Sequence, residues 1–107
     1  MIQLPVAQLS AWLADTVRPR PQLIDVRETW EYQICRIDGS ESMPLSRFAQ
    51  HIDAIDDIRP IVCICHHGTR SLQVAMALEH RGCREVYNLA GGVAAWAREV
   101  DPAMASY

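Results

Sequence analysis

Short apolar segments alternate with longer amphipathic segments along this chain. The apolar segments at residues 22–26 and 61–64 are rich in branched side chains and short enough for buried strands. Residues 2–4, 41–43 and 85–89 are further strand candidates. Because predicted strands and helices alternate with short connections, the pattern favours an α/β fold with an open, mostly parallel sheet covered by helices.

The amphipathic segments carry apolar residues at the three- and four-residue spacing of a helix. In the segment before the strand at 61–64, Ser46 is the expected N-cap. Gly82 is expected to end the next helix in the left-handed conformation, and close packing is expected at Gly91-Gly92. The predicted helices span residues 5–15, 28–34, 46–58, 72–81 and 91–100, and residues 101–107 form a short tail.

Composition narrows the possible classes of protein. A chain of 107 residues, half of them hydrophobic, predicts a single domain over residues 1–107. A net charge of −3 without a basic stripe argues against nucleic-acid binding.

No apolar run approaches the roughly 20 residues of a membrane span, and the first residues do not resemble a leader peptide. We therefore expect a cytoplasmic protein that binds neither nucleic acid nor membrane. All ten basic residues are arginine, which excludes Schiff-base and P-loop lysines.

The cysteines lack the spacing of a small secreted disulfide framework, so free thiols in a reducing compartment are expected. No metal site is expected, because alternate strand residues and two adjacent histidines do not converge on one tetrahedral ion. Cys63 is expected in the core, and Cys83 is most simply structural. Cys35 is also most simply structural, but a resolving or second sulfur-carrying role for it stays open. The four cysteines are Cys35, Cys63, Cys65 and Cys83.

The segment at residues 65–71 joins the predicted strand at 61–64 to the helix that follows. The first N–H groups of a helix lack intrahelical partners and carry the positive end of its dipole, so they favour an anion in this turn. Cys65 is the candidate nucleophile, present as a thiolate. Its expected binding loop consists of His66, His67, Gly68, Thr69, Arg70 and Ser71.

Two charged residues lie at the carboxyl end of the strand at 22–26 and are expected near this loop. Asp25 and Arg27 lie at the carboxyl end of that strand, where parallel sheets bind ligands. We expect them to form a buried or half-buried ion pair that supports the loop rather than to touch substrate.

The spacing within the loop distinguishes between chemistries. Four residues separate Cys65 from Arg70. Cysteine phosphatases place one residue more there, because a tetrahedral oxyanion needs a wider cradle. The shorter loop fits a single added atom, such as a sulfur carried as a persulfide on Cys65.

Several motifs resemble those of the rhodanese domain family, and specifically its short single-domain bacterial thiosulfate sulfurtransferases. They are Leu23-Ile24-Asp25-Val26-Arg27 with Glu31-Tyr32, Ile37-Asp38-Gly39-Ser40 before Met43-Pro44-Leu45, the loop at 65–71, and residues 88–96 from Asn88 to Trp96. The resemblance implies a five-stranded sheet with helices on both faces and a Cys65 persulfide held by loop amides. It also implies transfer of sulfane sulfur from a donor such as thiosulfate to cyanide or a thiol, either small or on a thioredoxin-like protein, without a cofactor.

Two positions depart from the family pattern and bear on the donor. Arg36 stands where the family usually has histidine, and it is expected either to add positive charge near the mouth or to be solvated. His67 occupies a position that is often basic in members that use thiosulfate. The alternative to a thiosulfate sulfurtransferase is a persulfide carrier in a relay for cofactor or RNA thiolation. A cysteine phosphatase or arsenate reductase is the third reading.

Overall fold

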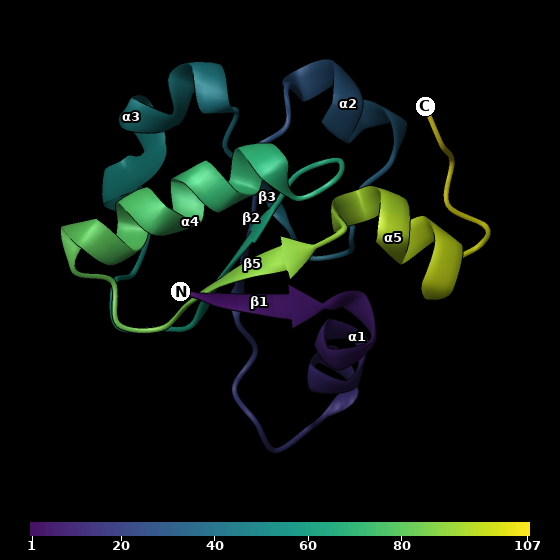
Figure 1. The fold of residues 1–107 in the computed structure, drawn as a ribbon, viewed down its shortest axis with the longest axis horizontal. Coiled ribbons are helices and arrows are strands. Elements are labelled where there is room, and N and C mark those ends of the chain that lie inside the picture. The colour runs from purple at the N-terminus through teal and green to yellow at the C-terminus, as the bar shows by residue number, and fades with distance from the viewer.

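Five parallel strands form a single sheet in the computed structural model, which describes residues 1–107 (Figure 1). Their order across the sheet is β1-β5-β4-β2-β3. Every neighbouring pair is parallel, as the sequence pattern and the resemblance predicted. The strands span Ile2–Pro5 (β1), Gln22–Asp25 (β2), Glu41–Ser42 (β3), Ile61–Ile64 (β4) and Val86–Ala90 (β5).

Helices cover both faces of the sheet (Figure 1). α1 and α5 contribute to the hydrophobic core on one face, and α4 contributes to the core on the other. The longest helix, α4, has 13 residues, and none of the helices combines the length and the apolar character needed to cross a membrane. The helices span Val6–Ala14 (α1), Thr29–Ile34 (α2), Phe48–His51 (α3), Thr69–Arg81 (α4) and Gly92–Glu99 (α5).

The strands divide their side chains between these two cores. Val62 and Ile64 of β4 face α1 and α5, whereas Ile61 and Cys63 face α4. Successive residues of a strand point to opposite faces, so a strand buried on both faces is apolar throughout. This is why residues 61–64 form a continuous apolar run, and why Cys63 lies in the core as predicted.

The predicted helix at residues 46–58 is wrong. A 3-10 turn at Leu45–Arg47, the single turn α3 and a second 3-10 turn at Ile52–Ala54 replace it. Ser46 does not cap a helix, because its hydroxyl donates to Glu28 Oε1 at 2.7 Å. Asp56 accepts the backbone N–H of Ile58 at 3.0 Å, a local bond that competes with helix formation. Three apolar residues of this segment, Phe48, Ile52 and Ile55, still pack on the α4 core.

Candidate active site

Cys65 directly follows β4, the central strand, on the side of the sheet where the strands have their C-terminal ends. The turn that follows is short, and α4 begins at Thr69, one turn earlier than the periodicity predicted. Gly68 forms the N-cap of α4 with φ +102°. A Cβ at this position would lie 3.2 Å from the backbone nitrogen of Gly91, so both backbone angle and space require glycine here. The turn thus brings the free N–H groups at the start of α4 close to the sulfur.

The Cys65 sulfur accepts two hydrogen bonds although the residue is only 1% exposed. Gly68 N–H lies 3.1 Å from Cys65 Sγ, and the Ser71 hydroxyl lies 3.2 Å from it. Burial raises the pKa of this thiol, but the Ser71 hydroxyl and the backbone N–H groups of Ser71, Gly68 and His67 outweigh burial and lower it overall. Cys63, buried without such donors, has its pKa raised to about 12. Of these two neighbouring thiols, Cys65 is therefore the one that ionises more readily.

The N-terminus of α5 orients the amides of the loop. Val93 N–H donates to the Cys65 carbonyl and Ala94 N–H to the His66 carbonyl, each at 2.9 Å. Because C=O and N–H of one trans peptide point in opposite directions, these bonds turn the following N–H groups toward the loop interior. A Cβ at Gly92 would lie 2.4 Å from the Cys65 carbonyl oxygen, so the close approach requires glycine. This confirms the close packing predicted at Gly91-Gly92.

Arg70 is bound to a carboxylate of α2. Its guanidinium makes two bonds to Glu31, with Nη1 2.7 Å from Oε2 and Nη2 2.9 Å from Oε1. The hydrogen bonds from Arg70 lower the pKa of Glu31 to about 2, so this carboxylate is charged and neutralises the guanidinium. Arg70 therefore fastens the loop to α2, and the donors that lower the pKa of Cys65 are chiefly Ser71 and the backbone.

Asp25 and Arg27 form the buried ion pair that the sequence predicted. Arg27 Nη2 lies 2.8 Å from Asp25 Oδ2, and both side chains are fully buried. Arg27 also donates to the Glu31 carbonyl at 3.3 Å and to the Cys35 carbonyl at 2.7 Å. The pair thus supports α2, which in turn holds Arg70.

The tail brings Tyr107 to this cluster. Its hydroxyl accepts a hydrogen bond from Arg27 at 3.0 Å and donates one to Glu31 Oε1 at 3.1 Å. Its ring stacks on His66, with centroids 4.1 Å apart and planes at 19°. Burial lowers the pKa of His66, so this imidazole is neutral at neutral pH. No pattern in the sequence marks the tail as part of the site.

The structure does not bring Arg36 to the loop. The Arg36 guanidinium lies over the Tyr32 ring, 5.1 Å from its centroid, and donates to the Tyr32 carbonyl at 3.2 Å. Of the two readings given for this residue, the structure agrees with the solvated one. His67 and Thr69 are exposed members of the loop.

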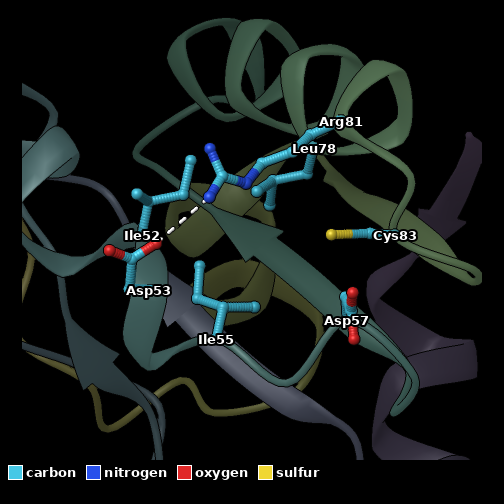
Figure 2. A pocket seen from close by; sticks show the side chains of 7 residues that line it. All are labelled: Ile52, Asp53, Ile55, Asp57, Leu78, Arg81 and Cys83. Atoms are coloured by element: carbon cyan, nitrogen blue, oxygen red, sulfur yellow. Dashed lines mark hydrogen bonds and ion pairs between the residues drawn. The ribbon is translucent and has the colours of Figure 1, made fainter.

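Cys35 lines a pocket with the loop residues His66 and His67, and its sulfur accepts a hydrogen bond from Arg27 Nη1 at 3.8 Å. Cys35 belongs to the core on the α1 and α5 face, whereas Cys65 belongs to the core on the α4 face. Cys83 lies beyond the other end of α4, where burial and the nearby Asp57 carboxylate raise its pKa. It lines a pocket together with Ile52, Asp53, Ile55, Asp57, Leu78 and Arg81 (Figure 2).

Fold and site together define the class: a parallel α/β domain in which a strand-to-helix loop donates hydrogen bonds to a buried cysteine sulfur. The model of the rhodanese-like domain family matches residues 6–99. The chain therefore belongs to the rhodanese-like domain family.

Curated relatives include sulfurtransferases and longer proteins. The chain is 30% identical over 97 residues to thiosulfate sulfurtransferase GlpE of Coxiella burnetii (strain RSA 331 / Henzerling II), covering 90% of this chain and 89% of that one. It is 35% identical over 75 residues to GlpE of Shewanella oneidensis, covering 70% and 74%. Protein YqhL of Bacillus subtilis is 37% identical over 81 residues, which cover 76% of this chain but only 64% of YqhL. The chain spans 36% of the rhodanese-like/PpiC domain-containing protein 12 of Arabidopsis thaliana.

Solved structures agree with the fold. A crystal structure from Staphylococcus saprophyticus superposes with a TM-score of 0.83 at 27% identity and covers 94% of this chain and 97% of that one. A rhodanese-like domain protein from Staphylococcus aureus also has a TM-score of 0.83, at 24% identity, with 94% and 95% covered. The second likeness supports the fold alone.

Proposed function

We propose that this protein is a sulfurtransferase that carries sulfane sulfur as a persulfide on Cys65. One observation carries the proposal: the Cys65 sulfur accepts hydrogen bonds from Gly68 N–H and the Ser71 hydroxyl at the start of α4. These donors stabilise a thiolate at neutral pH, and they stabilise a persulfide anion in the same way. The similarity to two proteins named thiosulfate sulfurtransferase supports this choice among the chemistries of a cysteine nucleophile.

The first half-reaction loads the cysteine. The Cys65 thiolate attacks the outer sulfur of thiosulfate, a new S–S bond forms, and the bond between the two thiosulfate sulfurs breaks. Sulfite leaves with the electron pair of that bond, so no proton is needed on the leaving group. The terminal sulfur of the persulfide carries the negative charge beside the N–H groups of the loop.

The second half-reaction unloads it. A cyanide ion or a thiolate attacks the terminal sulfur, forms a bond to it and displaces the Cys65 thiolate, which regains its electron pair. Product is thiocyanate or a new persulfide. The proposal includes no general base on the protein, because the donors of the loop favour the thiolate form of Cys65 in both half-reactions.

Thiocyanate formation from thiosulfate and cyanide tests the proposal. We expect turnover in the wild-type protein and none in Cys65→Ser. Cys83→Ser is the matched control, because it removes a thiol at the other end of α4 and should retain activity. A mass spectrum after incubation with thiosulfate alone should show the gain of one sulfur atom in the wild-type and Cys83→Ser proteins but not in Cys65→Ser. A fully active Cys65→Ser protein would refute the proposal.

A persulfide carrier is the second candidate, and the charges around the loop favour it. Asp25 neutralises Arg27 and Glu31 neutralises Arg70. A thiosulfate dianion therefore meets less attraction than an unpaired arginine would provide. If a cysteine desulfurase loads Cys65 and thiosulfate does not, the carrier is the correct reading.

A phosphatase or arsenate reductase is the third candidate. The four residues between Cys65 and Arg70 leave a narrow cradle for a tetrahedral oxyanion. Hydrolysis of an aryl phosphate without any sulfur transfer would reverse this ranking.

A further inference from the structure

Asn88, on β5, contacts the Cys65 loop at two points without bonding to the sulfur. Its Nδ2 donates to the Gly68 carbonyl at 3.0 Å, and its Oδ1 accepts a hydrogen bond from the Ser71 hydroxyl. The second Nδ2 proton goes to Gln3 Oε1, also at 3.0 Å. Asn88 and Ser71 are both buried. This orientation of the amide is the one that satisfies its neighbours, because the reverse would set Oδ1 against the Gly68 carbonyl.

The contact with Gly68 orients one peptide group of the loop. All peptide bonds are trans, so an outward carbonyl implies that the N–H of the same peptide points the other way. Asn88 holds the Gly68 carbonyl outward, which turns the Thr69 N–H toward the loop interior. The N-terminus of α5 does the same for the carbonyls of Cys65 and His66. Asn88 therefore adds the Gly68 carbonyl to those of Cys65 and His66, which α5 turns away from the sulfur.

The contact with Ser71 affects which acceptor receives the single hydroxyl proton of that residue. A hydroxyl has one hydrogen to donate, yet Ser71 Oγ lies within hydrogen-bond distance of both Asn88 Oδ1 and Cys65 Sγ. While Cys65 is a thiol, its S–H can donate to Ser71 Oγ. The Ser71 hydroxyl then donates its hydrogen bond to Asn88 Oδ1. When Cys65 ionises, the sulfur anion needs a donor, and the Ser71 proton must turn from Asn88 to the sulfur.

We propose that Asn88 is a positioning residue for Cys65: it holds the Gly68 carbonyl outward and keeps the Ser71 oxygen where the hydroxyl proton can turn to a sulfur anion. The inference rests on the proposed function, because it assigns Asn88 a part in sulfur transfer. Its test, however, measures ionisation of the thiol rather than sulfur transfer.

Other charged or titratable groups surround the loop and stay unchanged in the variants used for the test. Some act on Cys65 directly, and others act through Arg70 or α2. These groups are Cys63 on β4, Asp25 and Arg27 at the end of β2, Glu31 on α2, Arg70 at the start of α4, the loop residues His66 and His67, and Tyr107 of the tail.

Asn88→Asp tests the positioning role with a side chain of nearly the same size. A carboxylate accepts the Ser71 proton more strongly than an amide oxygen does, and it cannot donate to the Gly68 carbonyl. The pH profile of Cys65 alkylation by iodoacetamide gives the apparent pKa of the thiol. We expect this pKa to rise by at least about one unit, which slows labelling about tenfold at pH values below the wild-type pKa. An unchanged profile in folded Asn88→Asp protein overturns the proposal.

Two further variants separate positioning from the effect of an added charge. In a Ser71→Ala background, Asn88→Asp should raise the Cys65 pKa by less than half as much as it does in the wild-type background. An equal rise in both backgrounds means that Ser71 transmits none of the effect of Asn88, which overturns the proposal. Gln3→Glu adds a carboxylate beside Asn88 and still accepts its N–H, so it should shift the Cys65 pKa far less than Asn88→Asp. Equal shifts would also overturn the proposal.

A measurement on the unaltered side chain covers the case in which Asn88→Asp does not fold. In isotope-labelled wild-type protein, the Asn88 side-chain amide resonances should shift with pH at the midpoint of Cys65 labelling. The same shift should be absent from Cys65→Ala. Resonances that do not respond to Cys65 ionisation overturn the inference, whereas a failure of the proposed function appears separately, as a Cys65 thiolate that forms no thiocyanate.

Discussion

The two ends of α4 each carry a buried cysteine, and the two thiols are prepared in opposite ways. Cys65 precedes the helix and Cys83 follows it. The pKa of Cys65 is lowered and that of Cys83 is raised, although Cys65 is the more buried, at 1% against 8% exposure. Burial raises the pKa of both, so the difference comes from what surrounds each sulfur.

Hydrogen-bond donors explain the difference. At the N-terminal end, free N–H groups and the Ser71 hydroxyl face the Cys65 sulfur. At the C-terminal end, the helix presents carbonyl groups, and the Cys83 N–H is itself used on the Leu78 carbonyl. The same helix thus favours an anion at one end and disfavours it at the other. A thiol at a strand-to-helix junction gains reactivity from backbone geometry without a neighbouring base.

Two glycines offer the largest effect with which to test this comparison: Gly92, the first residue of α5, packs on the Cys65 loop, and Gly82 ends α4. Gly92→Ala should destabilise the fold by about 3 kcal/mol, because its Cβ would overlap the carbonyl oxygens of Cys65 and His66 at a φ of +59°. Gly82→Ala has a similar left-handed φ of +110° but no atom within 4 Å of the new Cβ, so about 1 kcal/mol is expected. Urea unfolding measures both free energies. An equal loss of unfolding free energy in the two variants would show that α5 can move away from the loop to accommodate the new Cβ.

The ion pairs at the two ends of α4 differ in burial and should differ in their response to pH. Glu31, 6% exposed, binds Arg70, and its pKa of about 2 lies below its ordinary value of 4.5. Its contribution is therefore complete above about pH 5 and is lost as pH falls toward 2. We expect Glu31→Gln to cost about 2 kcal/mol at pH 7, a figure reduced because Arg70 is 36% exposed, and the cost to shrink in acid.

The pair at the other end supplies the control for Glu31. Asp53, whose side chain is 91% exposed, binds Arg81 at 3.1 Å. Water screens this pair, so Asp53→Asn should change stability little at any pH. Unfolding curves at pH 7 and at about pH 3 compare the two variants. A loss of stability in Glu31→Gln that is the same at both pH values would mean that the carboxylate acts by packing rather than by charge.

Local patterns in the sequence predicted most of the fold and the position of Cys65 between a strand and a helix. The apolar run at residues 61–64, the glycine at position 82 and the segment after Cys65 each specify their structure through neighbouring residues. The helix predicted at 46–58 failed where a distant residue intervenes, because its apolar spacing indicated the core side but Ser46 bonds to Glu28, 18 residues away. Spacing detects which residues face the core, but it does not detect a polar partner from another element.

The partners within the site were the part that sequence reasoning could not supply. Arg70 meets Glu31 across 39 residues, Ser71 meets Asn88 across 17, and Tyr107 meets Glu31 across 76. Each contact depends on the order of strands in the sheet and on the path of the tail. Glu31 and Asn88 lie within the family motifs, which indicates that they matter. The motifs do not indicate which residue each of them binds.

Alkylation at neutral pH tests the comparison of the two thiols directly. Iodoacetamide should label Cys65 at least about tenfold faster than Cys83, because the larger thiolate fraction of Cys65 outweighs its lower intrinsic nucleophilicity. Peptide mass mapping at short reaction times gives both rates in one sample. Exposure alone predicts the reverse order, since Cys83 is the more exposed residue. Faster labelling of Cys83 would therefore show that access rather than ionisation controls these thiols.

The smallest expected effect concerns the charge next to Cys83. The Asp57 carboxylate contributes to the raised pKa of Cys83, after burial, and the two residues line one pocket (Figure 2). Asp57→Asn removes that charge, so labelling of Cys83 at about pH 8 should become roughly twofold faster. The rate at Cys65 should not change, because the donors that set its pKa lie at the opposite end of α4. A rate increase at both thiols would mean that long-range charge, rather than the local set of donors, distinguishes the two ends of the helix.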